Sequence, residues 1–178
     1  MNIPNLLTIL RLLLIPVFVY VFFFFNEHNI LYATGIFILA GVTDGLDGYI
    51  ARKYNLVTKI GQMLDPLADK LMQITVIACF TVAGILPIWI LTIIVAKESL
   101  MIIGGMVLYT RKEKIVIPAD HLGKAATVLF YLAILLIAFD SPYGKYLIII
   151  TISLTLISFF RYLRLALRKM KERETGQQ

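Results

Sequence analysis

The sequence has few of the residues that stabilise secreted or zinc-bound modules. Its 178 residues include one cysteine, Cys79, and only 16% of them are charged. A single cysteine cannot form an intrachain disulfide, so the sequence excludes a disulfide-stapled secreted module and a zinc cluster built on cysteines. The scarcity of charge also excludes a disordered tail protein. None of these absences excludes an enzyme.

Hydrophobic residues are abundant instead, at 60% of the chain. A helix needs about 20 apolar residues to cross a bilayer, and the apolar segments fill nearly the whole sequence. We therefore expect one membrane domain over residues 1–178, of the all-α class, with six transmembrane helices. The segments run roughly over 9–25, 31–51, 62–83, 85–109, 122–139 and 145–166. Residues 2–8 either form a short interfacial helix or simply open the first span.

The positive charges are distributed unevenly along the chain, whose net charge is +6. An even number of spans places both termini on one side, and most Lys and Arg fall there. These are Arg11, Arg52, Lys53, Lys59, Arg111, Lys112, Lys114 and Lys124, with Arg161, Arg164, Arg168, Lys169, Lys171 and Arg173 in the tail. The positive-inside rule then predicts a multi-pass protein of the cytoplasmic (inner) membrane, with both termini in the cytoplasm. Nucleic acid is not needed to explain the basic balance.

Four carboxylates lie where a membrane makes charge costly. Asp44 and Asp47 end the second segment, and Asp65 and Asp69 begin the third. An ionised side chain in a span costs about 2.5–3.5 kcal/mol on insertion scales. Spacings of three and four residues place each pair on one helix face. A short loop makes the two segments antiparallel, so we expect one cluster of four acids at matching depth near the cytoplasmic end.

Clustered acids need neutralising cations, because the carboxylates would otherwise repel one another. With no cysteine or histidine nearby, the oxygen donors favour Mg²⁺ or Mn²⁺, and two such divalent cations would balance four acids. Paired metals are used for displacement at phosphorus. Gly48, Ala51 and Gly61 leave the adjacent helix faces bare, so a flat group such as a base could approach. The alternative is a divalent-cation or proton transporter, although beyond the cluster the two spans are mostly apolar and offer few polar residues, such as Thr43 and Gln73, for a path to the other side.

The spacing of these residues identifies a family resemblance. Asp44-x2-Asp47-Gly48-x2-Ala51-Arg52-x8-Gly61-x3-Asp65-x3-Asp69 resembles the signature of the CDP-alcohol phosphotransferases. Residues 2–8, continued through Arg11 and Pro16, are similar to the opening of the bacterial phosphatidylglycerophosphate synthases within that family. The resemblance implies a six-span enzyme, a homodimer, that transfers the phosphatidyl group of CDP-diacylglycerol to an alcohol and releases CMP.

The same resemblance implies roles for the signature residues. Asp44, Asp47 and Asp65 would hold one metal ion, and Asp69 would join them at the second. Asp69 would also be the catalytic base on the acceptor hydroxyl, a role that requires reach to that proton. The cytidine and pyrophosphate site would be lined by Asp47, Gly48, Ala51, Arg52 and Gly61. Catalysis would be mostly electrostatic, through charge stabilisation on the diphosphate and the leaving CMP.

The acceptor that the resemblance implies is sn-glycerol 3-phosphate, whose phosphate needs fixed cations. The candidates are Lys124, Lys97 and Arg111. In the alternative interpretation, Lys97 pairs with Glu98 or with the carboxylates, and Lys124 is an interfacial anchor. The synthases tend to have Arg-Glu where this chain has Lys97-Glu98, and two lysines where residues 123–127 have one. A cardiolipin synthase of the CDP-alcohol type, with phosphatidylglycerol as acceptor, is therefore the alternative function.

The basic tail offers a further choice. Arg161, Arg164 and Arg168 fall on one helical face. They either hold anionic lipid headgroups or serve only as a positive-inside tail.

Overall fold

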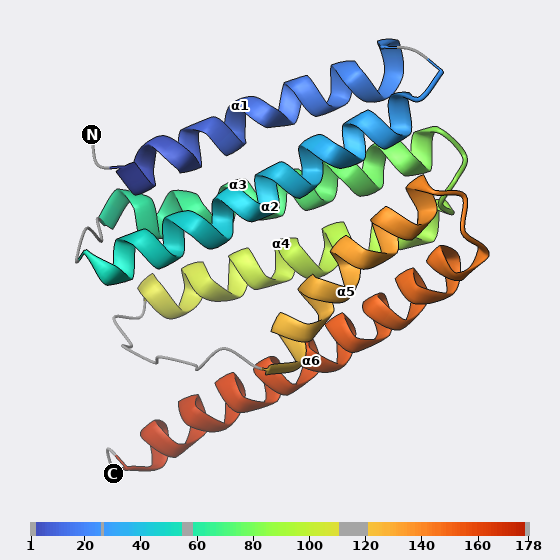
Figure 1. Cartoon of the computed structure of the whole chain (residues 1–178). Helices are drawn as coiled ribbons and strands as arrows, with labels where there is room; N and C mark the ends of the chain where they lie inside the picture. Colours follow the sequence, from blue (N-terminus) through green and yellow to red (C-terminus); the bar gives the residue numbers. More distant parts are fainter. Residues whose placement is uncertain (1–2, 26, 55–58, 111–120, 177–178) are drawn as a thin grey trace. The chain divides into compact units, whose positions relative to one another are not determined.

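The protein is all-helical in the part of the chain that the computed structural model describes, residues 3–25, 27–54, 59–110 and 121–176 (Figure 1). No strand occurs within these ranges. The helices are α1 (Ile3–Phe24), α2 (Asn29–Lys53), α3 (Lys59–Val82), α4 (Ile88–Thr110), α5 (His121–Ala138) and α6 (Pro142–Gly176). Each predicted apolar segment corresponds to one helix, so the predicted fold class is confirmed.

Every helix end differs by at least one residue from the predicted segments, and three of the differences have a plain interpretation. Helix α1 already begins at Ile3, so residues 3–8 open the first helix and do not form a separate interfacial helix. Helix α4 begins after Pro87, which the predicted segment 85–109 had included, because a fixed φ and a missing N–H suit the turn before a helix. Helix α6 continues to Gly176, beyond the predicted end at 166, because the tail consists largely of good helix formers.

The described helices have the apolar length that a membrane protein needs. Three stretches are long and apolar enough to cross a bilayer, namely Asn5–Phe24, Asn29–Ile50 and Pro142–Arg168. A shorter apolar helix covers Leu122–Ala138. Helix α3 is more polar, since its first half carries the predicted acids. The composition and the helices together define an integral membrane protein.

The chain forms two compact units, Met1–Leu91 and Thr92–Gln178. In the first unit, α1 packs against α2 and α3, and α2 also contacts α3 (Figure 1). Fully buried phenylalanines fill this packing, and the rings of Phe22 on α1 and Phe80 on α3 lie 5.1 Å apart. The prediction of a single domain over residues 1–178 stays a prediction.

The inward face of α1 sets up the candidate site. Thr8, Arg11, Phe18 and Phe22 recur at helical spacing and are all at most 2% exposed. The two phenylalanines lie toward the end of α1 and belong to the apolar core. The two polar residues lie toward its start, so this face of α1 presents a hydroxyl and a guanidinium to α2 and α3.

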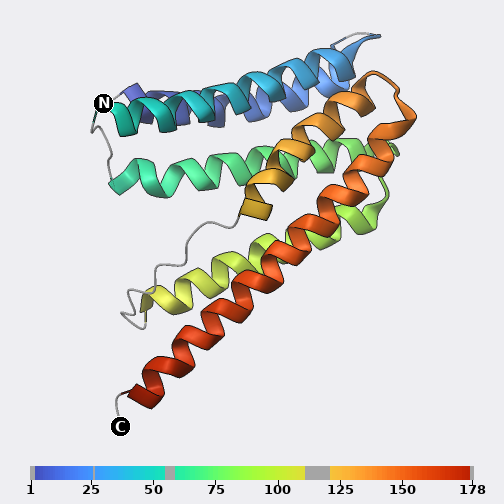
Figure 2. The same cartoon turned by 60° about the horizontal axis from the view of Figure 1, so that its bottom comes forward.

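In the second unit, α5 and α6 form an antiparallel pair (Figure 2). Asp140 lies in the short turn after α5 and has a φ of 53°, which helps to reverse the chain. Gly144 then lies so close to α5 that a Cβ there would be 2.8 Å from the backbone nitrogen of Ile137. A glycine is required at this close approach. The buried side chains along the pair are Ala126, Phe130, Ala133, Ile134, Ile137, Ile148 and Ile152.

Candidate active site

One buried guanidinium joins both acids of α2. Arg11 Nη1 lies 2.6 Å from Asp44 Oδ1, and Arg11 Nη2 lies 2.5 Å from Asp47 Oδ2. The side chains of Arg11 and Asp47 are 1% and 3% exposed, whereas that of Asp44 is 42% exposed. Because the two acids are three residues apart on one helix, a single guanidinium reaches both of them.

Helix α1 also contacts the first acid of α3. The Thr8 hydroxyl donates a hydrogen bond to Asp65 Oδ1. Arg11 Nη1 lies 3.4 Å from the backbone oxygen of Asp65, to which it donates a second bond. Thr8 and Arg11 therefore connect α1 to the acidic ends of both α2 and α3.

Asp69 is held from its own helix. Gln73 Nε2 donates to Asp69 Oδ1 at 3.1 Å and to Oδ2 at 3.0 Å, one helical turn away. Lys70 Nζ lies 3.7 Å from Asp69 Oδ2. Asp44 in turn experiences the charges of both Asp65 and Asp69. The four acids thus belong to one electrostatic cluster within the first unit.

The chemistry of this donor set fits a hard divalent ion, because it offers carboxylate oxygens on neighbouring helices. Within the described ranges, however, no three acid, histidine or cysteine groups converge closely enough to hold one metal ion. Arg11, Thr8 and Gln73 each contact a carboxylate of this set. An ion bound at these carboxylates would meet these three side chains as neighbours.

The residues predicted to line the nucleotide site flank the acids. Gly48 follows Asp47 on α2 and is partly exposed, and Gly61 lies buried in the first turn of α3. Ala51 and Arg52 belong to the last turns of α2, and their side chains lie outside what the structure describes. Their assignment to the nucleotide site stays a prediction.

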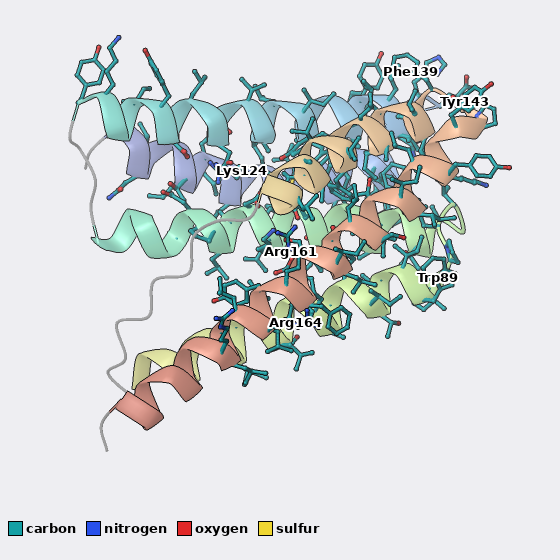
Figure 3. All side chains as sticks on the ribbon, turned by 90° about the horizontal axis from the view of Figure 1, so that it is seen from below. Trp89, Lys124, Phe139, Tyr143, Arg161 and Arg164 are labelled. Atoms are coloured by element: carbon teal, nitrogen blue, oxygen red, sulfur yellow. The ribbon has the colours of Figure 1, made fainter. Side chains whose placement is uncertain are left out.

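The three candidate cations for the acceptor phosphate differ in their surroundings. Lys124 is exposed in the first turn of α5 (Figure 3). Lys97 Nζ lies 2.6 Å from Glu98 Oε1, with both side chains largely buried, so the alternative interpretation of Lys97 matches this contact. Arg111 lies outside the described residues. Lys124 is thus the candidate whose exposed position suits an incoming anion.

Helix α6 carries a groove near two arginines of the tail. The groove has a volume of about 560 Å³ and is lined by Ile157, Phe160, Arg161, Leu163, Arg164 and Leu167. Figure 3 labels the two arginines on α6. Gly123 on α5 lies against Ser158 on α6, since a Cβ on Gly123 would be 3.2 Å from Ser158 Oγ. Lys124 directly follows Gly123, and Ser158 is about one helical turn before Arg161. Apolar walls with guanidinium groups suit an anionic lipid, and a positive-inside tail stays the alternative.

Sequence reasoning missed two residues of the site, Thr8 and Arg11. Arg11 was counted only among the basic residues of the cytoplasmic side, whereas the residue lies inside α1 and is buried against the acids. A usable signal existed. A charged residue in a 22-residue apolar helix, on the face that also carries Phe18 and Phe22, has to meet a partner inside the protein.

Comparison with known proteins identifies the class. Residues 1–157 match the CDP-alcohol phosphatidyltransferase family, and the chain belongs to that family. The family is generally metal-dependent, in agreement with the oxygen donors of the cluster.

The chain is similar to named members of two kinds. A Rickettsia typhi protein named CDP-diacylglycerol–glycerol-3-phosphate 3-phosphatidyltransferase is 35% identical over 179 residues, covering 92% of this chain and 96% of that protein. A Pseudomonas fluorescens protein of the same name is 50% identical over 72 residues, covering 40% and 37%. A putative cardiolipin synthase of Mycobacterium tuberculosis is 35% identical over 127 residues, covering 71% and 59%.

Proposed function

We propose that the protein transfers the phosphatidyl group of CDP-diacylglycerol to sn-glycerol 3-phosphate, which gives phosphatidylglycerophosphate and CMP. The observation that carries the proposal is the cluster of four carboxylates on α2 and α3 in a member of this family. The names of the Rickettsia and Pseudomonas relatives support this acceptor. The activity therefore belongs to phospholipid biosynthesis.

In this reaction the acids would hold two divalent cations, Mg²⁺ or Mn²⁺. Asp44, Asp47 and Asp65 would be ligands of one ion, and Asp69 would join at the second. When bound, the ions supply positive charge that stabilises the diphosphate and the leaving CMP. Asp47, Gly48, Ala51, Arg52 and Gly61 would position the nucleotide and its diphosphate.

Asp69 would take the proton of the acceptor hydroxyl as the acceptor oxygen attacks the phosphorus that carries the diacylglycerol. The bond from that phosphorus to the CMP oxygen then breaks, and CMP leaves. The two hydrogen bonds from Gln73 orient the Asp69 carboxylate along its helix. This support suits a general base, which must point at one proton in a defined direction.

A cardiolipin synthase that uses phosphatidylglycerol as acceptor is the second candidate. Two observations favour it, the similarity to the Mycobacterium protein and the pairing of Lys97 with Glu98. That pairing leaves fewer cations for a terminal phosphate. A divalent-cation or proton transporter finds no support in the names of the relatives.

Lys124→Ala is expected to raise the KM for glycerol 3-phosphate about ten-fold or more, because a hydrogen bond to a charged group contributes about 1.5–3 kcal/mol. The KM for CDP-diacylglycerol should change little. Steady-state CMP release with each substrate varied in turn measures both values. Lys145→Ala is the matched control, since Lys145 is also an exposed lysine but lies near the start of α6.

Product analysis separates the two acceptors. Wild-type protein should make phosphatidylglycerophosphate when given CDP-diacylglycerol and glycerol 3-phosphate. Protein that ignores glycerol 3-phosphate and makes cardiolipin from phosphatidylglycerol would refute the first proposal and establish the second.

We also propose a homodimer in the cytoplasmic membrane, with the active site and both termini facing the cytoplasm. In a Cys79→Ser background, cysteines at positions 59 and 114 should react with an impermeant thiol reagent only from the cytoplasmic side. A cysteine at position 141, in the α5–α6 turn, should react only from outside. Position 114 lies outside the described residues and serves as a sequence-based probe. Reaction of position 59 from outside would place the acids at the wrong face.

A further inference from the structure

In the described part of the chain, every contact of the Arg11 guanidinium is with a residue of the acidic cluster. Nη1 contacts Asp44 Oδ1 and lies 3.4 Å from the Asp65 backbone oxygen, and Nη2 contacts Asp47 Oδ2. Arg11 Nε is buried with no hydrogen-bond partner among the described residues. A buried guanidinium is stable only with partners for its charge, and here the partners are these carboxylates.

The same carboxylates are the proposed ligands of the divalent ion. Mg²⁺ binds carboxylate oxygens at about 2.0–2.1 Å, so an ion at Asp44 and Asp47 would share their negative charge with the Arg11 guanidinium. Two cations a few ångströms apart repel each other strongly in a partly buried site. Either the guanidinium shifts away from these carboxylates as the ion binds, or the ion binds less tightly because Arg11 stays.

The charge count points the same way. Four ionised acids meet two cationic side chains in the described contacts, Arg11 and Lys70. Two negative charges remain, whereas the two proposed divalent ions carry four positive charges, so the ions and these side chains together exceed the charge of the acids. Arg11 therefore does part of the neutralisation that the ions would otherwise do alone.

We propose that Arg11 is a built-in cation of the cluster that competes with the divalent ion for Asp44 and Asp47. It gathers the two carboxylates before an ion binds, and it lowers the affinity of the site for that ion. Arg11 is thus a positioning residue, acting through the metal ligands rather than on the substrate. This inference rests on the proposed metal-dependent function and concerns the regulation of the same site.

If the Arg11 contacts were only a structural tie between α1 and α2, a different effect of the ion on stability would be expected. Such a tie would stabilise the protein equally with and without the ion. Competition instead predicts that the ion restores the stability that is lost with the guanidinium, because the ion then binds Asp44 and Asp47 without a competing cation. The size of the ion-dependent stabilisation distinguishes the two cases.

The experiment uses the full-length protein in detergent and compares wild type with Arg11→Gln, Arg11→Lys and Lys145→Gln. Mn²⁺ binding is followed by the electron paramagnetic resonance signal of the free ion, and the Tm is measured in EDTA and in saturating Mn²⁺. Lys145→Gln is the matched control, since Lys145 is exposed on α6 in the other unit.

Arg11→Gln should bind Mn²⁺ about ten-fold or more tightly than wild type, because a like charge next to the ion is removed. Its Tm should fall in EDTA and recover with Mn²⁺ by more than the wild-type shift. Arg11→Lys keeps the charge but cannot bridge two carboxylates, so its Kd should lie between those of wild type and Arg11→Gln. Lys145→Gln should match wild type in both measurements.

Equal or weaker Mn²⁺ binding by Arg11→Gln, or an equal loss of Tm with and without the ion, would overturn the inference. If Arg11→Gln does not fold under either condition, Arg11→Lys decides, and a Kd equal to that of wild type overturns the competition. Failure of the proposed function would be recognised from the wild-type protein alone. In that case wild type itself would bind no Mn²⁺ and would release no CMP from CDP-diacylglycerol with any acceptor.

Discussion

Asp69→Asn is expected to abolish CMP release. Asparagine keeps the size of the side chain but cannot accept the acceptor proton, and positioned bases contribute about 10²–10⁴-fold to rate. Loss of a metal ligand adds to this effect. Asp44→Asn, Asp47→Asn and Asp65→Asn should be inactive for the second reason alone. CMP release from CDP-diacylglycerol and glycerol 3-phosphate measures each variant.

The matched control for these variants is Asp140→Asn in the α5–α6 turn. Its φ of 53° is one that asparagine also adopts, so both activity and Tm should stay near the wild-type values. EDTA should stop the wild-type reaction, and added Mg²⁺ or Mn²⁺ should restore it. Full activity in metal-free buffer would contradict the assignment of the acids as metal ligands.

Phe80→Ala is expected to lower the free energy of unfolding by about 3–5 kcal/mol, the usual cost of removing a buried phenylalanine. The side chain is completely buried on α3, and its ring lies 5.1 Å from that of Phe22 on α1. The contact joins the helix that carries Asp65 and Asp69 to the helix that carries Arg11. Denaturation of the purified protein in detergent, followed by circular dichroism, measures the change.

Phe24→Ala is the matched control, because Phe24 lies near the end of α1 and is 73% exposed. Its removal should leave stability almost unchanged, since no cavity forms in the interior. If both variants lost the same stability, contact with detergent or lipid would explain the effect better than packing between α1 and α3.

The sequence by itself determined the six helices and the positions of the acids along them. The length of an apolar segment and the spacing of residues along a helix are local properties of the chain. The spacing of Asp44 and Asp47 placed both acids on one face, and one guanidinium does reach both. The spacing of the signature residues also identified the family, which the match over residues 1–157 confirms. Helix ends were less certain, because capping and the extension of α6 depend on residues at the margins of the apolar segments.

Only the tertiary structure decided which partners the charged residues find. In a membrane protein, residues that face lipid and residues that face other helices are both apolar, so the sequence pattern does not reveal which face of α1 is buried. A charge such as Arg11 signals an inward face but does not name its partner. Packing brought Arg11 to Asp44 and Asp47, and Thr8 to Asp65, from positions 33–57 residues away in the chain. These contacts join separate helices, and helical periodicity alone does not specify them.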